Sequence, residues 1–331
     1  MAPEPPSDAP VLPSAASPSR LLCCSGADDP RLPDVVAAVR ALEPAGEFEA
    51  KRERVVAGVP ADLGRTIREG FRVEPINAGG VRAELIVPPG ARSPGMLVCF
   101  HGGGYVVCTA GTHRRRFAHM AAAAGCLALN VDYRLAPEHP FPAAIEDAVA
   151  AVRWAATRGP VVVLGDSAGG GLALAAGLAL ADDADARPAG VVAISPWSDL
   201  TLAGRSHIER RDRDPFAHID DLPAYVECYL GGATPPTDPL ASPLFGDFSG
   251  YPPLLVQVGS EETMYDDALL VAEKAACQGA DVTFEEWEGM FHTWHAHVGG
   301  LTGADDAIAS IGRFVADHLA PQPRNGRART N

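Results

Sequence analysis

The chain has little positive charge and no long apolar run. Its 331 residues include 27 Lys and Arg against 42 Asp and Glu, a formal charge of −15. Nucleic acid and anionic membranes repel such an acidic surface, so we expect neither as a partner. No stretch approaches the roughly 20 consecutive apolar residues that a membrane-spanning helix needs. These two deficits favour a soluble protein.

A disulfide framework and a secretory leader are also lacking. The seven cysteines are odd in number, and only Cys23 and Cys24 are neighbours. The first residues are acidic and proline-rich, whereas a leader begins with basic residues followed by an apolar stretch. Scattered cysteines of this kind predict reduced thiols and a cytoplasmic location.

Short β-rich runs alternate with helical patterns along most of the chain. The eight expected strands are 71–76, 82–87, 96–100, 127–132, 161–164, 191–195, 254–258 and 282–287. The middle runs are apolar at almost every position, as in strands that are covered on both faces. Strands that alternate with helices predict a mostly parallel, doubly wound α/β sheet flanked by helices.

Two segments interrupt this alternation, and both terminal regions differ from the rest in composition. We expect residues 31–65 and the insertion 203–250 to form a helical cap over the carboxyl edge of the sheet, where ligands bind in open α/β folds. The main domain then covers residues 66–320. The proline-rich segment 1–30 is expected to be mobile and 321–331 to be a solvated tail.

The strongest local signal is GDSAGG at 165–170, directly after an expected strand and before an apolar helical pattern. This G-x-S-x-G spacing makes a sharp turn between strand and helix that exposes a serine. Gly165 and Gly169 are needed because side chains there would collide with neighbouring backbone. The turn would place Ser167 at a helix N-terminus, where a developing anion is favoured. No Lys-Ser or Lys-Thr follows, which argues against a phosphate-binding loop. We therefore expect Ser167 to be a nucleophile, the alternative being an incidental serine in a glycine-rich turn.

A second glycine cluster, HGGG at 101–104, follows the expected strand 96–100. Acyl transfer develops negative charge on a carbonyl oxygen, which preorganised N–H donors must stabilise. Consecutive glycines let backbone N–H groups approach without side-chain obstruction. We expect the N–H groups of Gly103, Gly104 and Ala168 to form an oxyanion hole. A triple glycine alone is more often a flexible turn.

A nucleophilic serine needs a base and an acid that orients it, and in α/β hydrolases the chain order is serine, acid, histidine. The base is therefore expected late in the chain, where His292 has His295 and His297 as rivals. Three histidines could also suggest a metal site, but no further ligands with supporting spacing accompany them. The acid should follow the strand 254–258. Asp266 and Asp267 are better explained as helix-capping residues, and spacing does not separate Glu261 from Glu262.

Taken together, these residues resemble the hormone-sensitive-lipase-like family of α/β hydrolases, the bacterial carboxylesterases, in the sub-branch named for its GDSAG motif. The resemblance covers about residues 71–319 and rests on motifs that stand in the family's order. They are HGGGY at 101–105, YRLAPEHPFPAAIED at 133–147, GDSAGG at 165–170, SPWSDL at 195–200 and GMFHTWH at 289–295. The resemblance implies an α/β-hydrolase fold with a helical cap, Ser167 as nucleophile and His292 as base. It puts Glu262 where many members carry Asp, so Glu262 is the expected acid and Glu261 the second candidate.

The sequence thus predicts a serine carboxylesterase that hydrolyses small to medium acyl esters through an acyl-enzyme, with no metal or organic cofactor. The alternatives are a natural-product tailoring enzyme on the same fold (dehydratase, cyclase or acyl transferase) and a non-catalytic ligand receptor. A complete serine, acid and histidine set favours hydrolysis over both.

Other features of the binding site and assembly stay open at this level. Trp197 and Phe216 are candidate walls of the substrate pocket, although either could be ordinary core. Cys108 stands where relatives often carry a small residue, and it either lines the entrance or is buried and inert. Relatives often pair through the last edge strand, here near 282–287, so a homodimer is possible.

Overall fold

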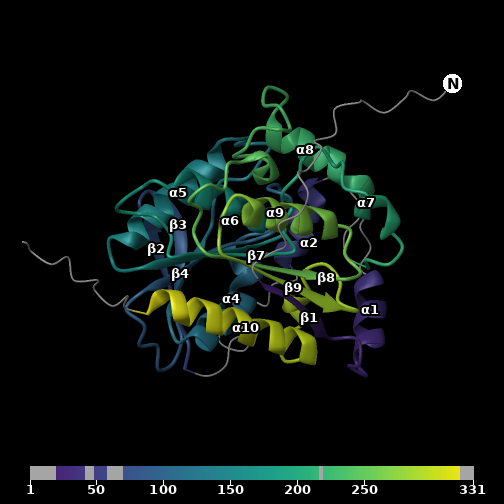
Figure 1. Ribbon diagram of the computed structural model, residues 1–331, viewed down its shortest axis with the longest axis horizontal. Coiled ribbons are helices and arrows are strands. Elements are labelled where there is room, and N and C mark those ends of the chain that lie inside the picture. The colour runs from purple at the N-terminus through teal and green to yellow at the C-terminus, as the bar shows by residue number, and fades with distance from the viewer. Residues whose placement is uncertain (1–19, 42–47, 58–69, 216–218, 321–331) are drawn as a thin grey trace, which may run out of the picture.

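The computed structural model describes residues 20–41, 48–57, 70–215 and 219–320 (Figure 1). Its strands are β1 (Arg20–Ser25), β2 (Arg72–Ala78), β3 (Val81–Val87), β4 (Met96–Phe100), β5 (Leu127–Val131), β6 (Val161–Asp166), β7 (Gly190–Ile194), β8 (Leu254–Gly259) and β9 (Val282–Glu288). Its α-helices are α1 (Leu32–Arg40), α2 (Phe48–Ala57), α4 (Ala110–Ala124), α5 (Ala143–Ala156), α6 (Ala168–Ala179), α7 (Ser206–Glu209), α8 (Leu222–Leu230), α9 (Tyr265–Cys277) and α10 (Thr302–Leu319). Short 3₁₀ turns lie at Ile219–Asp221, Pro243–Phe245 and Trp294–His297.

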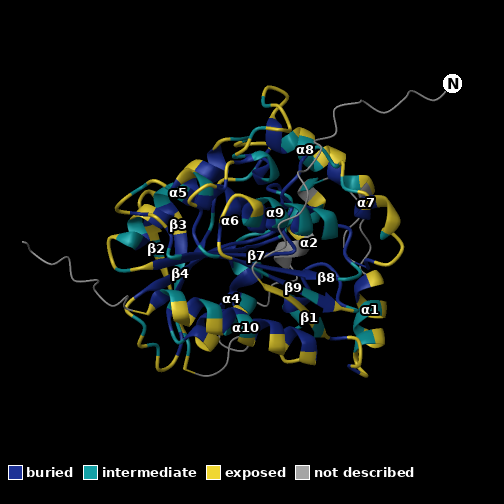
Figure 2. Ribbon diagram, viewed as in Figure 1, coloured by how far each residue is buried: buried dark blue, intermediate teal, exposed yellow. Residues whose placement is uncertain are grey.

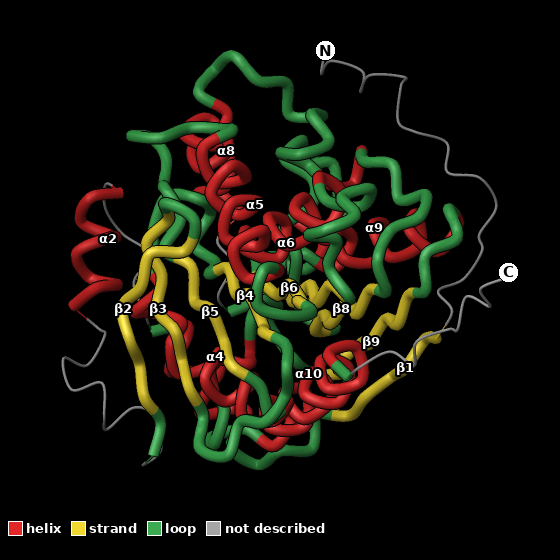
Figure 3. The backbone as a smooth tube through the Cα atoms, turned by 90° about the vertical axis from the view of Figure 1, so that its left-hand side faces the viewer, coloured by secondary structure: helices red, strands yellow, loops and turns green. Residues whose placement is uncertain are grey.

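The strands form one sheet in the order β1-β9-β8-β7-β6-β4-β5-β3-β2. All neighbours pair in parallel except β5 with β3 and β3 with β2, which are antiparallel. Helices α5, α6 and α9 cover one face, and α4 and α10 cover the other (Figure 3). The predicted α/β-hydrolase architecture with a mostly parallel sheet is confirmed.

Alternation along the central strands explains why they are apolar at almost every position. Val98 and Phe100 of β4 pack into the core under α5 and α6, whereas Leu97 and Cys99 pack against α4 and α10. Successive side chains of a strand point to opposite faces, so a strand covered on both sides needs apolar residues at every position. All five β4 residues are buried, and the central sheet is the most completely buried layer (Figure 2).

The sheet has nine strands, where eight were expected. Residues 20–25, which we placed in a mobile segment 1–30, form β1, and this strand pairs in parallel with β9 from Arg20 opposite Thr283 to Ser25 opposite Glu288. Mobility was therefore the wrong expectation for this stretch, while residues 1–19 and 321–331 lie outside the described part. Because β1 occupies the outer side of β9, that strand is not an open edge for the expected homodimer.

Helix α1 follows β1 and closes the same end of the sheet. Its Val39 packs against Trp287, Met290 and Trp294 in a small apolar cluster. The β1–α1 unit thus covers the region where the chain leaves β9. Among the helices in the described ranges, none has both the length and the apolar character needed to cross a lipid bilayer.

Removing residues 1–25 is expected to destabilise the protein, because β9 would lose its pairing with β1 and become an unpaired edge. The melting temperature should fall by at least about 2 °C and association should become concentration-dependent. Scanning calorimetry and light scattering would measure both effects. Removal of residues 1–19, which keeps β1, is the matched control. Equal melting temperatures for the two truncated proteins would contradict the prediction.

Candidate active site

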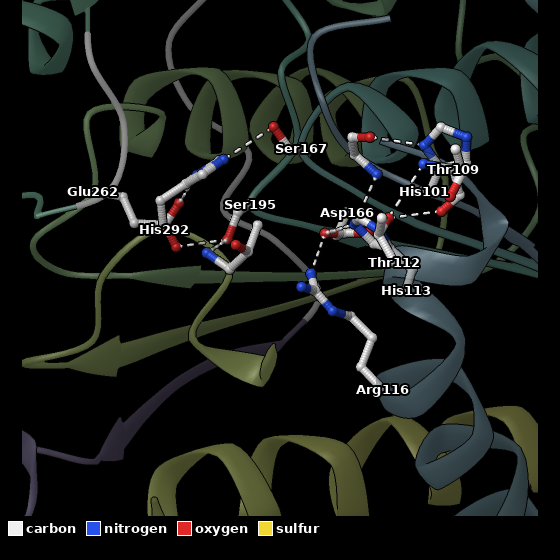
Figure 4. A network of polar contacts seen from close by, with 12 residues as sticks. His101, Thr109, Thr112, His113, Arg116, Asp166, Ser167, Ser195, Glu262 and His292 are labelled. Carbon is white, nitrogen blue, oxygen red and sulfur yellow. Dashed lines mark hydrogen bonds and ion pairs between the residues drawn. The ribbon is translucent and has the colours of Figure 1, made fainter. Parts of the chain in front are cut away.

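The turn between β6 and α6 holds Ser167 in a strained conformation, with φ 56° and ψ −123°. Both flanking glycines are required by close backbone contacts. A Cβ on Gly165 would collide with the carbonyl oxygen of Gly169, and one on Gly169 would collide with that of Phe100. The expectation that side chains at these two positions would strike backbone is confirmed. The turn leaves the Ser167 side chain at the carboxyl edge of the sheet, beside the start of a helix (Figure 4).

The glycine loop, residues 101–104, lies directly against this turn. A Cβ on Gly102 would come within 3.1 Å of the Ser167 Cβ. Gly103 and Gly104 have φ values of 111° and 60°, which favour glycine, and a Cβ on Gly103 would collide with the carbonyl oxygen of Val107. The loop backbone therefore sits beside the serine, as stabilisation of an oxyanion by its N–H groups would require.

Ser167, His292 and Glu262 form a continuous line of hydrogen bonds (Figure 4). Ser167 Oγ lies 2.9 Å from His292 Nε2, and His292 Nδ1 lies 3.0 Å from Glu262 Oε2. A carboxylate accepts, so Nδ1 carries a proton and Nε2 is left to accept the serine hydroxyl. This is the geometry that a nucleophile, a base and an orienting acid need.

The structure separates the two candidate acids. Glu262 is completely buried and faces His292, whereas Glu261 turns outward and forms a 2.6 Å ion pair with Arg213. The rival histidines also lie elsewhere: His295 contacts Gln257 Oε1 at 2.7 Å and His297 packs on the ring of Phe291.

Glu262 has two further donors, both on Oε1. The backbone N–H of Gly259 and the hydroxyl of Ser195 each donate at 2.7 Å. Ser195 follows β7 with φ 44°, and its oxygen accepts a hydrogen bond from the N–H of Thr293. Sequence reasoning used Ser195 only as part of the SPWSDL motif and assigned it no role in the site.

The buried environment and the neighbouring charges shift the pKa of His292 in opposite directions. Burial lowers the pKa, but the hydrogen bond and charge of Glu262 raise it, aided by the charges of Asp214 and Asp166. The net pKa of His292 lies above its usual value. Burial raises the pKa of Glu262, and its bonds to His292 and Ser195 oppose that rise. The pair therefore favours a protonated imidazole when a proton leaves the serine.

One turn of α4 supports the glycine loop and the serine turn from below (Figure 4). Arg116 donates to Asp166 Oδ2 at 2.6 Å, and His113 Nε2 lies 3.2 Å from the same oxygen. The N–H of Gly102 also donates to His113 Nε2 at 3.1 Å. Burial alone would raise the pKa of Asp166, but His113 and Arg116 hold it well below its usual value. His113, to which sequence reasoning assigned no role in the site, is thus part of a buried polar network.

The two residues expected to line the substrate pocket, Trp197 and Phe216, differ in what the structure describes. Trp197 is 1% exposed and packs in the core, and its backbone N–H donates to the carbonyl oxygen of Ser167, so the structure supports the alternative interpretation of it as core. Phe216 lies outside the described residues. Cys108 is half-buried with its Sγ close to Gly103, and burial raises the pKa of its thiol to about 11, so it stays protonated at neutral pH.

Tyr225 of α8, which sequence reasoning missed, lies on the glycine loop. A Cβ on Gly104 would collide with its ring, and the ring also meets Phe48 of α2 with centroids 4.7 Å apart. In the same helix as Phe48, Arg52 donates to the carbonyl oxygen of Val106 at 2.6 Å. The two segments expected to form the cap therefore contact each other and the glycine loop through α2 and α8.

Within the described ranges, no group of three or more His, Cys, Asp or Glu side chains is arranged to hold a metal ion.

A family model for the alpha/beta hydrolase fold matches residues 97–296. A crystal structure of an esterase from the bacterial hormone-sensitive lipase family is 39% identical, with a TM-score of 0.82, over 88% of this chain and 99% of that one. The chain belongs to this hydrolase family. It is, accordingly, a carboxylic ester hydrolase.

Two curated relatives of the hydrolase carry related names. An acetyl-hydrolase from Streptomyces hygroscopicus is 45% identical over 72% of this chain and 81% of its own length. The putative acetyl-hydrolase LipR from Mycobacterium tuberculosis is 34% identical over 76% of this chain and 82% of its own length.

Replacing Ser195 by Ala removes one donor from the buried Glu262 carboxylate and one acceptor from Thr293. A lost buried hydrogen bond of about 1–2 kcal/mol should lower the kcat for ester hydrolysis roughly five- to thirtyfold. Steady-state kinetics on a soluble chromogenic ester would measure this. Ser310→Ala is the matched control, because Ser310 makes the same type of bond to Glu285, away from Ser167. Equal kcat values for the two variants would refute a role for Ser195 in holding Glu262.

Proposed function

We propose that this hydrolase is a serine carboxylesterase that cleaves small to medium acyl esters through an acyl-enzyme on Ser167. The observation that carries the proposal is the hydrogen-bonded line from Ser167 through His292 to the buried Glu262, with distances of 2.9 and 3.0 Å. No cofactor is needed for this chemistry, since the nucleophile, base and acid are all side chains.

In the first half-reaction, Ser167 Oγ bonds to the ester carbonyl carbon while its proton passes to His292 Nε2. The carbonyl electron pair moves to the oxygen and gives a tetrahedral oxyanion. When that pair returns, the bond to the leaving alcohol breaks and His292 supplies the alcohol with its proton. Glu262 holds Nδ1 in the donor tautomer and stabilises the imidazolium that exists between the two steps.

In the second half-reaction, water replaces the alcohol. His292 takes a proton from the water as its oxygen attacks the acyl carbon, and the second oxyanion collapses by breaking the bond to Ser167 Oγ. His292 then returns the proton to the serine, which restores the enzyme and releases the carboxylic acid. Each half-reaction uses the same base, so one histidine suffices.

The N–H groups of Gly103, Gly104 and Ala168 are the proposed oxyanion donors. Ala168 begins α6 and Gly103 and Gly104 belong to the glycine loop beside Ser167, so the donors come from two elements that meet at the serine. Each donor of this type contributes roughly 3 kcal/mol to stabilising the transition state.

The size of the acyl group is the finer part of the proposal. Tyr225 lies over Gly104, which narrows the space next to the proposed oxyanion hole. The Streptomyces relative is named for an acetyl group, the smallest common acyl group. Both observations favour short acyl chains. The cytoplasmic location and the homodimer stay predictions.

Ser167→Ala should abolish hydrolysis of p-nitrophenyl esters, because it removes the hydroxyl that lies 2.9 Å from His292 Nε2. Rates from acetate to laurate on the unchanged enzyme should be highest at short chain lengths. A rapid-mixing experiment on p-nitrophenyl acetate should show a burst of about one nitrophenolate per protein, and mass spectrometry should find the acyl group on Ser167. Undiminished activity in Ser167→Ala would show that the nucleophile lies elsewhere.

Glu262→Gln should lower kcat strongly, by about 10³-fold or more, because an amide can stabilise the wrong imidazole tautomer and carries no charge. Glu261→Gln makes the same chemical change one residue away, where the carboxylate pairs with Arg213, and should retain most activity. Steady-state kinetics on both variants would separate the two glutamates. A larger loss in Glu261→Gln would reverse the assignment of the acid.

A further inference from the structure

Asp214 is a buried carboxylate that the proposed mechanism does not use. It lies in the 203–250 segment, shortly after α7, and is 5% exposed. Its backbone N–H donates to the carbonyl oxygen of Arg210, so its main chain is held by a local turn. The side chain points away from that turn toward the loops that follow β8 and β9.

The Asp214 carboxylate joins these two loops. Its Oδ2 accepts hydrogen bonds from the N–H of Thr263 at 3.0 Å and from the Thr263 hydroxyl at 3.3 Å. Its Oδ1 accepts from the N–H of His292 at 3.4 Å. Thr263 directly follows Glu262. The Asp214 carboxylate therefore contacts the backbone next to the proposed acid and the backbone of the proposed base.

The bonds that Asp214 makes suit a carboxylate better than an amide. The Thr263 N–H, the Thr263 hydroxyl and the His292 N–H all donate to its oxygens, and an ionised Asp offers only acceptors. Asn in its place would turn an NH₂ group toward one of these N–H groups. The carboxylate also lies 3.4 Å from the backbone nitrogen of His292, in a region where burial weakens solvent screening.

Carboxylates from three elements raise the pKa of His292. Glu262 contacts it after β8, Asp166 approaches from the end of β6, and Asp214 approaches from the 203–250 segment; of these, Asp166 is itself paired with Arg116. Asp214 and Glu262 both raise the pKa of His292, whereas its burial lowers it. Asp214 also raises the pKa of Glu262.

We propose that Asp214 is a positioning residue of this esterase: it ties the 203–250 segment to the loops of Glu262 and His292 and adds a second negative charge beside the imidazolium formed during catalysis. This inference rests on the proposed function of the Ser167, His292 and Glu262 set. The 203–250 segment would then raise the pKa of His292 through Asp214, in addition to contacting the glycine loop through Tyr225.

The test is the pH dependence of kcat/KM for p-nitrophenyl acetate in Asp214→Asn. Without the negative charge, the pKa of His292 falls, so the base stays unprotonated down to a lower pH. The acid limb of the profile should therefore move to lower pH by about half a unit or more, and kcat should fall by about tenfold as the imidazolium loses a stabilising charge. KM should change less than kcat, because the contacts of Asp214 with Thr263 and His292 act on the base and its loop.

Asp220→Asn is the matched control. It makes the same change of charge in the same segment, at an exposed residue paired with Arg211, and should leave both the acid limb and kcat as they are. If Asp214→Asn does not fold, as judged by circular dichroism, Asp214→Ser removes the same charge and keeps one acceptor. An acid limb that stays in place in the folded variant, or moves equally in Asp220→Asn, would overturn the proposal. So would a fall in melting temperature with no change in the profile.

The wild-type protein and Ser167→Ala are measured alongside. Hydrolysis that depends on Ser167, combined with an unshifted profile in Asp214→Asn, would reject the role of Asp214 alone. Hydrolysis that persists in Ser167→Ala would reject the proposed function itself.

Discussion

The burial of the Glu262 carboxylate constrains everything around Ser167. A buried charge is costly unless donors surround it, and this one has three: Gly259 N–H, the Ser195 hydroxyl and His292 Nδ1. Those donors come from three separate strand ends, so satisfying one carboxylate fixes the relative positions of three loops. The same requirement orients the imidazole, and hence the nitrogen that faces the serine. Stability and chemistry here depend on the same hydrogen bonds.

Parallel strands make this convergence possible, because their carboxyl ends share one edge of the sheet. Five strands end at the site. The glycine loop follows β4, Ser167 follows β6, and Ser195 follows β7. Glu262 follows β8 and His292 follows β9. Close backbone contact then sets the fine spacing. Gly169 has no room for a Cβ against Phe100, so the start of α6 comes near enough to β4 for the serine turn and the glycine loop to touch.

The sequence predicted those parts of the molecule that depend on residues close together in the chain. The central strands are apolar at almost every position, and Ser167 lies in a turn whose glycines are dictated by local geometry. Contacts between residues far apart in the sequence could not be predicted from it. β1 is a short edge strand with exposed Leu21 and Leu22, and it exists through pairing with β9 more than 250 residues later. Glu261 and Glu262 follow the same strand, and only the tertiary positions of Arg213 and His292 distinguish them.

The contacts of the 31–65 and 203–250 segments connect the shape of the site with its chemistry. Tyr225 rests on Gly104, and Arg52 binds the carbonyl oxygen of Val106, just beyond the glycine loop. Asp214 contacts the backbone of the acid and base loops. Under the proposed mechanism, a change in either segment would therefore also move the glycine loop or the Asp214 carboxylate next to His292. Substitutions in these segments should change substrate range and rate together. The segments whose residues lie beside the glycine loop also contact the loops of Glu262 and His292.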